Sequence, residues 1–346
     1  LPAHNSYIRD TPQFILPDVT RPVMDLFACE TGALLACAAY LLEEEFNAVS
    51  PFVLTCIEDN LKRRILLPYL TAHFWWMGHD DEPMCNWTVW CTQNVLLTTF
   101  LMPWSEEMSS KLAAPVRAFT GDAPLFLPEN TSDTVVALQA ILHKAAESCD
   151  YFLKDYGNDG CCEEGAQYYR HAGLCLYGAM TVLNTVTGGH FASLFQLDKV
   201  KNIAAYILNV HVDDKYYFNF ADCSPIAGRA GVREYLFGKA TGQEDLCLFA
   251  AKDFQAGQGQ LITDEVNGGN LFYRMQTVFH YNELMRQDTS QPLSHRDVYY
   301  PSVGLFLVHS ATMDLAVKAG DNADSHNHND TGSVTLYKNG HPILVD

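Results

Sequence analysis

Hydrophobic residues recur at helical spacing over most of the chain. Between residues 51 and 70, Leu54, Ile57, Leu61 and Ile65 fall on one face of a helix. Ser50-Pro51 is a typical start for such a helix, because serine caps the first turn and proline fits its first position. The same spacing predicts further helices at residues 31–45, 87–101, 132–154, 166–186, 197–210, 229–238 and 268–286.

The pattern changes near Gln291-Pro292, where short apolar runs replace the helical spacing. Asn339-Gly340 between two such runs is a strong β-hairpin signal, because both residues tolerate the positive φ angles of a type I′ turn. Strands are predicted at residues 304–309, 314–318, 334–338 and 341–346.

The two patterns together predict an α+β chain in series, with a helical domain over residues 1–290 and the start of an antiparallel β domain over residues 291–346. Because a terminal pair of strands cannot bury itself, we expect further strands beyond residue 346 in the full protein.

Composition and charge narrow the function classes. The formal net charge is −19, from 22 Lys+Arg against 41 Asp+Glu, which argues against binding to nucleic acid. No apolar run approaches the roughly 20 residues of a membrane-spanning helix, so no membrane partner is expected.

The eleven cysteines favour a reducing compartment. Their number is odd, and many lie in apolar helical stretches, where free cysteine behaves as a small hydrophobe. A cytoplasmic location is therefore favoured over secretion or the periplasm. Because the chain begins with Leu1, a removed signal peptide stays open.

Three stretches could carry chemistry, and the first is the alternation of His326, His328 and Asp330. Alternate residues of an extended segment point the same way, so these side chains could converge on a metal or form a ligand beside a base. A polar loop that only caps backbone groups before a strand is the alternative.

The second stretch is NDGCCEEGAQYYRHAG, residues 158–173. Glu164 and Tyr168 are four residues apart and share one helical face. The alternative is an ordinary turn followed by a helix N-terminus, where acidic residues are favourable.

The third stretch, His73 to Trp90, holds Trp75, Trp76, Trp87 and Trp90. Such rings can stack on sugars, although core packing explains them equally well.

The order of these motifs resembles the heparinase II/III-like family of polysaccharide lyases. The resemblance rests on Asn86-Trp87, on DGxxxEGxxY at residues 159–168, and on GDNxxSHNHNDTGSxxLYxNGxPxLxD at residues 320–346. It implies an incomplete α/α toroid followed by an antiparallel β-sandwich, and cleavage of uronate polysaccharides by β-elimination.

The resemblance also assigns roles to individual residues. It implies that Asn86 meets the substrate carboxylate and that Tyr168 and His326 are catalytic. His328 and Asp346 match two zinc ligands, and the third would lie beyond residue 346. Because two protein ligands are too few for a tight site, we expect zinc to be absent or weakly held by this chain.

The chemistry of β-elimination suits these residue types. An amide such as Asn86 can donate to the uronate carboxylate and stabilise the enolate-like state. A tyrosine or histidine can take the C5 proton, and a phenol can protonate the departing O4. Asn86, Tyr168 and His326 are therefore expected to converge on one cleft.

The sequence departs from the family pattern in ways that leave the base open. Cys85 stands where the family often has asparagine, and Trp87 stands where some relatives have a histidine base. The base is thus Tyr168 or His326. The remaining candidate substrate-binding residues, of which Glu164 could also be structural, are Trp76, Trp87, Glu164, Tyr169 and Arg170.

The expected partner is an anionic uronate-containing polysaccharide or oligosaccharide. A uronyl C5-epimerase is the alternative activity, because it starts with the same proton abstraction. A non-catalytic glycan-binding relative is the alternative from another class. The strong negative charge favours short or sparsely charged chains over heavily sulfated ones. The glycan itself and the oligomeric state do not follow from the sequence.

Overall fold

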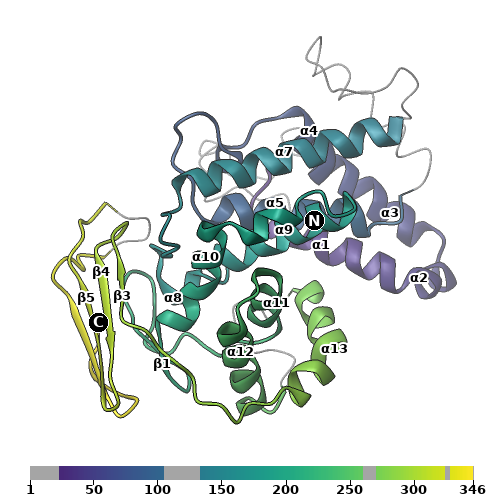
Figure 1. Ribbon diagram of the computed structural model, residues 1–346. Coiled ribbons are helices and arrows are strands. Elements are labelled where there is room, and N and C mark those ends of the chain that lie inside the picture. The colour runs from purple at the N-terminus through teal and green to yellow at the C-terminus, as the bar shows by residue number, and fades with distance from the viewer. Residues whose placement is uncertain (1–22, 105–132, 260–269, 324–327, 346) are drawn as a thin grey trace. The chain divides into compact units, whose positions relative to one another are not determined.

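A computed structural model describes residues 23–104, 133–259, 270–323 and 328–345 (Figure 1). Its helices are α1 Leu26–Leu41, α2 Glu43–Val49, α3 Phe52–Leu61, α4 Leu67–Thr71, α5 Asn86–Leu101, α7 Asp133–Asp155, α8 Gly165–Tyr168, α9 Gly173–Val186, α10 Asp198–Asn209, α11 Val232–Thr241, α12 Glu244–Ala256 and α13 Leu271–Arg286. A π-helical turn, Lys62–Leu66, and two short 3₁₀ helices, Trp75–Met77 and Ala192–Gln196, complete the helical elements. The strands are β1 His211–Asp213, β2 Tyr216–Tyr217, β3 Val298–Tyr300, β4 Leu305–His309, β5 Met313–Lys318, β6 Val334–Lys338 and β7 His341–Leu344.

The predicted fold class is confirmed: a helix-rich region precedes a five-stranded antiparallel sheet. By contacts, the chain divides into two compact units. Unit 1 comprises Leu1–Phe152 and Gly178–Gly188, and unit 2 comprises Leu153–Tyr177 and Gly189–Asp346. This division does not follow the predicted domain boundary at residue 290, which stays a prediction, as does the incomplete toroid.

In unit 1, α1 packs closely against α5. The buried face of α1 consists of small residues, which let the two helices approach. Gly32 shows how close they are, because a Cβ there would lie 2.9 Å from Thr98 Oγ1. Among the described residues no single helix is long and apolar enough to cross a bilayer. Only α1 and α2 together, bent by 87° where they meet, pass that test.

In unit 2, α11, α12 and α13 pack against one another, and α10 contacts α11 and α12 (Figure 1). The single helix predicted at residues 166–186 is wrong, because it is broken into α8 and α9. Between them Leu174 N donates to Tyr169 O at 3.1 Å, one residue wider than an α-helical bond. The Tyr169 ring fills the space over Gly173, where a Cβ would lie 2.6 Å from it.

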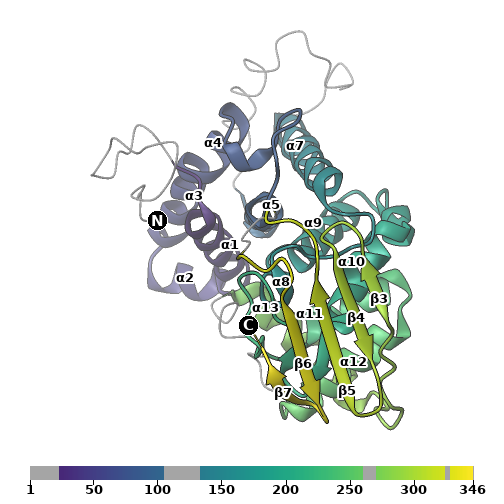
Figure 2. The same cartoon turned by 90° about the vertical axis from the view of Figure 1, so that its left-hand side faces the viewer.

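The strands follow one another in the order β3-β4-β5-β6-β7, and every neighbouring pair is antiparallel (Figure 2). The predicted hairpin at Asn339-Gly340 is confirmed. Both residues have positive φ, 49° and 74°, and Lys338 pairs directly with His341 across the turn.

The two faces of this sheet differ. Leu305, Leu307 and Tyr337 on one face are buried, and the Tyr337 hydroxyl donates to Tyr217 O at 2.8 Å. The other face is also apolar but open: Phe306 is 43% and Val334 43% exposed. Strand pairing aligns its side chains in the row Tyr299, Phe306, Val317 and Val334. A β-sandwich covers such a face with its second sheet.

Three histidines meet where β4 packs on the helical part of unit 2. His211 Nδ1 and His295 Nε2 lie 3.4 Å apart, and the His295 ring stacks on His309 with ring centres 4.7 Å apart. The two nitrogens of His309 face the Asp314 carboxylate and the Asn209 carbonyl, at 3.0 and 3.1 Å. Both partners are hydrogen-bond acceptors and hold the ring in this orientation.

Candidate active site

Tyr168 ends α8, and the turn before that helix fixes its position. Gly165 begins α8 with φ of 88°, a conformation that favours glycine. A Cβ at Gly165 would lie 2.7 Å from Cys223 Cβ and 2.8 Å from Phe220 O. The EG pair of the DGxxxEGxxY motif therefore packs α8 directly against residues 220–223.

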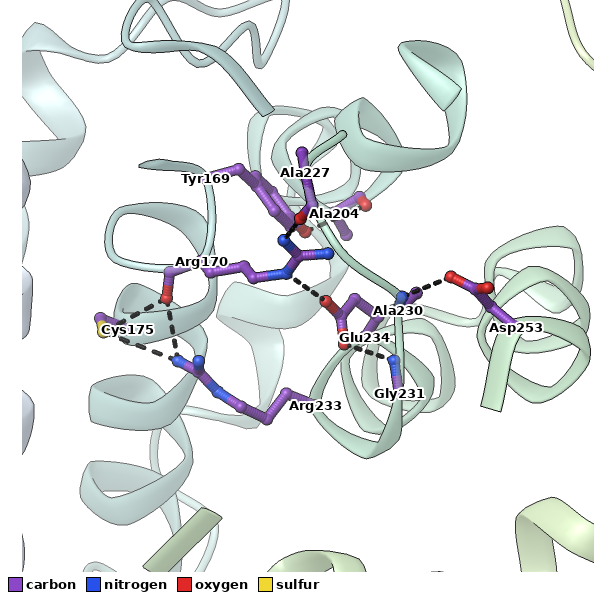
Figure 3. Close-up of polar contacts among 10 residues, drawn as sticks. All are labelled: Tyr169, Arg170, Cys175, Ala204, Ala227, Ala230, Gly231, Arg233, Glu234 and Asp253. Atoms are coloured by element: carbon purple, nitrogen blue, oxygen red, sulfur yellow. Dashed lines mark hydrogen bonds and ion pairs between the residues drawn. The ribbon is translucent and has the colours of Figure 1, made fainter. Parts of the chain in front are cut away.

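The two residues after Tyr168 anchor it to the interior of unit 2 (Figure 3). Tyr169 is fully buried, and its hydroxyl donates to Ala204 O at 3.2 Å. Arg170, 2% exposed, donates from Nη1 to Ala227 O, and its Nε lies 3.5 Å from Glu234 Oε1. In this arrangement both side chains support Tyr168, whereas the sequence suggested that they bind substrate.

The same buried network extends along α11 (Figure 3). Glu234 Oε2 accepts from Gly231 N at 2.9 Å, which caps the start of α11. Arg233 Nη2 donates to Arg170 O at 3.1 Å, and its guanidinium lies 3.8 Å from the centre of the Tyr273 ring. Each of these buried charges thus has a partner of opposite charge, a carbonyl or a ring, as burial of charge requires.

A second loop connects Tyr168 with the polar run at residues 328–330. Asp330 is buried, and its carboxylate accepts a hydrogen bond from Ala221 N at 2.6 Å. Next to Ala221, the Asp222 carboxylate lies 2.9 Å from His328 Nε2. On the other side of the loop, Ser224 N donates to Gln167 Oε1 at 3.5 Å. The described structure thus brings α8, residues 220–224 and residues 328–330 together within unit 2.

The electrostatics around Tyr168 favour its protonated form. The side chain is half-buried, and burial together with the negative charges of Asp222 and Glu164 raises the pKa of its phenol. Glu164 itself is 3% exposed and sits at the start of α8, which fits its structural interpretation.

Asp222 is the residue that sequence reasoning missed in this site. The HxHxD alternation singled out Asp330 as a possible ligand, but not as the acceptor for the backbone of Ala221. No pattern around Asp222, in FNFADCSP, marks it as a partner of His328.

Unit 1 carries the other candidate residues. Asn86 begins α5 and is 1% exposed. Trp76 is fully buried, donates from Nε1 to Met24 O at 2.9 Å and stacks on Tyr69, so it belongs to the core of unit 1. Its neighbour Trp75 is partly exposed and contacts Trp87, also partly exposed, with ring centres 5.1 Å apart. Trp75 therefore replaces Trp76 as the aromatic candidate that a sugar could reach.

Two predictions lie partly outside the described residues. His326 and Asp346 are both outside them, so the convergence of Asn86, Tyr168 and His326 stays a prediction. Among the described ranges, no group of three His, Cys, Asp or Glu side chains is arranged so that it could hold a metal ion. His328 faces Asp222, so the described residues alone do not fit a zinc site, and zinc binding by His328 and Asp346 stays a prediction.

Comparison with known families agrees with the motif at the end of the chain. Residues 293–346 match the model of the C-terminal region of heparinase II/III-like proteins. No curated protein matches the chain. The matched segment contains β3 to β7 and His328, and a family of this name points to polysaccharide lyases. The match over residues 293–346 therefore supports the resemblance of this chain to the heparinase II/III-like family.

Proposed function

We propose that the protein is a lyase that cleaves a uronate-containing polysaccharide or oligosaccharide by β-elimination. The observation that supports this best is the joining of Tyr168 to residues 328–330 through the loop at residues 220–224. A half-buried tyrosine beside the heparinase-like segment suits an acid–base reaction, since a binding protein needs no such proton donor.

In this proposal Tyr168 is the acid. A phenol is protonated at neutral pH, so Tyr168 can donate to the departing O4. Before O4 departs, His326 takes the C5 proton, and Asn86 donates to the uronate carboxylate while negative charge develops. One proton leaves C5, the C4–O4 bond breaks, and one proton reaches O4, so the step needs no oxidant or added water.

Incubation of the protein with a panel of uronate polysaccharides tests the proposal. A lyase produces a conjugated unsaturated uronate that absorbs in the ultraviolet. A C5-epimerase produces no such absorbance but exchanges the C5 proton with deuterium from solvent. A glycan-binding protein does neither, and either of these results contradicts the lyase.

A further inference from the structure

We propose that His171 is a positioning residue for Tyr168: its buried ring packs against the phenol ring and holds it in the orientation that proton donation requires. This inference rests on the lyase proposed above and adds to it a residue that acts through Tyr168 rather than on the substrate. The role belongs to the ring of His171 as a packing surface, and its nitrogens transfer no proton.

The contact between the two rings is direct. The ring centres of Tyr168 and His171 lie 5.9 Å apart, and the ring planes are tilted by 59°. This separation is typical of aromatic pairs that attract each other beyond the effect of burial alone. His171 is 2% exposed, whereas Tyr168 is half-buried. The imidazole is therefore a closed support, and the phenol that it supports keeps one side open.

The backbone between the two residues fixes this contact. The amides of His171 and Ala172 both donate to Tyr168 O, at 2.8 and 2.9 Å. Side chains three residues apart in a helical turn lie on the same face, so the turn brings the two rings together. Leu176 N then donates to Ala172 O at 2.9 Å, where α9 begins. His171 thus stands directly before a regular helix, which gives it a rigid base.

His171 has a different task from the two residues that precede it. Tyr169 and Arg170 donate to backbone carbonyls of distant segments, and these bonds fix the main chain around α8. They do not fix the Tyr168 side chain, whose Cα–Cβ bond has three staggered wells. The contact with the His171 ring restricts that rotation, because only one orientation of the phenol keeps it.

A restricted phenol matters for the proposed reaction. Proton donation to O4 needs an aligned hydroxyl within hydrogen-bond reach, and a misplacement of about 1 Å can cost on the order of 100-fold in rate. Loss of one aromatic contact weakens the preference for one orientation by a factor of about 2 to 10. Removal of the ring should therefore lower kcat about tenfold and change KM little, because the contact acts on the reacting group and not on binding.

Three variants separate support by the ring from catalysis by the imidazole. His171→Ala removes the ring, whereas His171→Phe keeps a ring without an ionisable nitrogen. Phe195→Ala is the matched control. Phe195 is another buried ring of unit 2, 7% exposed, and it contacts Tyr177 with ring centres 6.2 Å apart. Ultraviolet absorbance of the product gives kcat and KM across neutral and mildly alkaline pH, and thermal unfolding gives the melting temperature.

We expect His171→Ala to lower kcat about tenfold, and His171→Phe to retain it within about twofold with an unchanged pH profile. Phe195→Ala should lose stability but keep its kcat. A kcat in His171→Phe as low as in His171→Ala, or a shifted pH profile, overturns the inference, because the nitrogens would then be required. A kcat in His171→Ala equal to that of Phe195→Ala overturns it too, because the ring would then serve stability alone.

A measurement without substrate distinguishes the two proposals. 3-Fluorotyrosine in place of Tyr168 reports on the phenol ring by ¹⁹F NMR. In the otherwise unchanged chain its resonance should lie away from that of the unfolded chain, because the ring is restricted beside the imidazole. His171→Ala should move the resonance towards the unfolded position and sharpen it, whereas Phe195→Ala should not. A resonance at the unfolded position in the otherwise unchanged chain overturns the inference, even if no variant folds.

The two readouts can then be combined. If no uronate polysaccharide gives product while the resonance responds to His171→Ala, the lyase is wrong and the support of Tyr168 by His171 is retained. If product forms but neither kcat nor the resonance responds to His171→Ala, the lyase stands and the role of His171 is wrong.

Discussion

Each compact unit contains a pair of consecutive aromatic residues of which the first is partly exposed and the second is buried. In unit 1, Trp75 is partly exposed and Trp76 is fully buried. In unit 2, Tyr168 is half-buried and Tyr169 is fully buried. In both pairs the second residue donates a hydrogen bond to a distant backbone carbonyl, from Trp76 Nε1 to Met24 O and from the Tyr169 hydroxyl to Ala204 O.

The difference within each pair shows how a reachable side chain can be held precisely. The buried residue fixes the backbone at that point. The side chain of the adjacent residue therefore leaves the backbone in a fixed direction, although it is only partly packed itself. A site built in this way keeps an open side chain on a rigid support, as positioning of a reacting group requires. The two members of a pair should therefore respond differently to substitution, one in function and the other in stability.

The largest expected effect is on turnover at Tyr168. Tyr168→Phe removes only the proton donor, so kcat should fall by about 100-fold or more while the melting temperature hardly changes. Tyr169→Phe is the matched control. It loses one buried hydrogen bond, worth about 1 kcal/mol, and should keep most of its turnover. Near-normal kcat in Tyr168→Phe would show that the phenol has no catalytic role.

Loss of the buried tryptophan should give the largest loss of stability. Trp76→Ala leaves a cavity against Tyr69 and Phe74 and should lower the free energy of unfolding by about 3–5 kcal/mol. Chemical denaturation measures this, with the denaturant dependence checked for a single transition. A loss below about 1 kcal/mol would mean that Trp76 is not a core residue.

Two histidines, His211 and His295, should make the protein less stable in acid. Burial lowers the pKa of His211 from 6.5 to about 4. The hydrogen bond to the Asp214 carbonyl opposes this shift, and the charge of His309 adds to it. The pKa of His295 is lowered to about 3, mainly by burial and further by the charges of His211 and His309. Asp213 opposes this shift. Arg229 also faces His211 and favours its neutral form.

Because the folded pKa values are depressed, the unfolded chain binds more protons below pH 6.5. Stability is therefore fully present above that pH and falls as the pH drops towards 4, by on the order of 3 kcal/mol for His211. Urea denaturation at pH 7 and pH 4.5 measures the difference. His295→Asn should flatten this pH dependence, whereas substitution of the exposed His143 should not; an equal slope in both would contradict the assignment.

The smallest effect is expected at the exposed tryptophan. Trp75→Ala should change stability by less than about 1 kcal/mol, because the ring is only partly buried. If a sugar stacks on Trp75 and Trp87, KM should rise about fivefold with kcat retained, since about 1 kcal/mol of binding is lost. A rise in KM for Trp76→Ala but not for Trp75→Ala, in folded protein, would reverse the comparison.

Local patterns predicted much of the fold. The helical spacing placed most helices, and Asn339-Gly340 placed the last hairpin with its register. The helix α12 was missed although Leu246, Phe249, Ala250 and Phe254 have helical spacing, because acidic and small residues interrupt the apolar signal. The short β1–β2 hairpin was missed because its strands have only three and two residues.

The candidate site was less predictable, because long-range packing decides it. Tyr168 lies in a motif, but nothing local distinguishes Trp75 from Trp76, and the choice between them depends on a bond to Met24, 52 residues away. Asp222 meets His328 across 106 residues of sequence, a contact that no periodicity encodes. Sequence motifs identify the residue types that suit the chemistry. Tertiary contacts decide which residue of a given type is accessible to a ligand.

The open apolar face of the sheet has a consequence for the chain of residues 1–346 in solution. The apolar row of Tyr299, Phe306, Val317 and Val334 favours association between molecules. The net charge of −19 opposes association by electrostatic repulsion. That repulsion reaches about 30 Å at 0.01 M salt but only about 8 Å at physiological ionic strength. Colloidal stability should therefore be highest in dilute buffer and decrease as salt is added, which is the reverse of an assembly held by ion pairs.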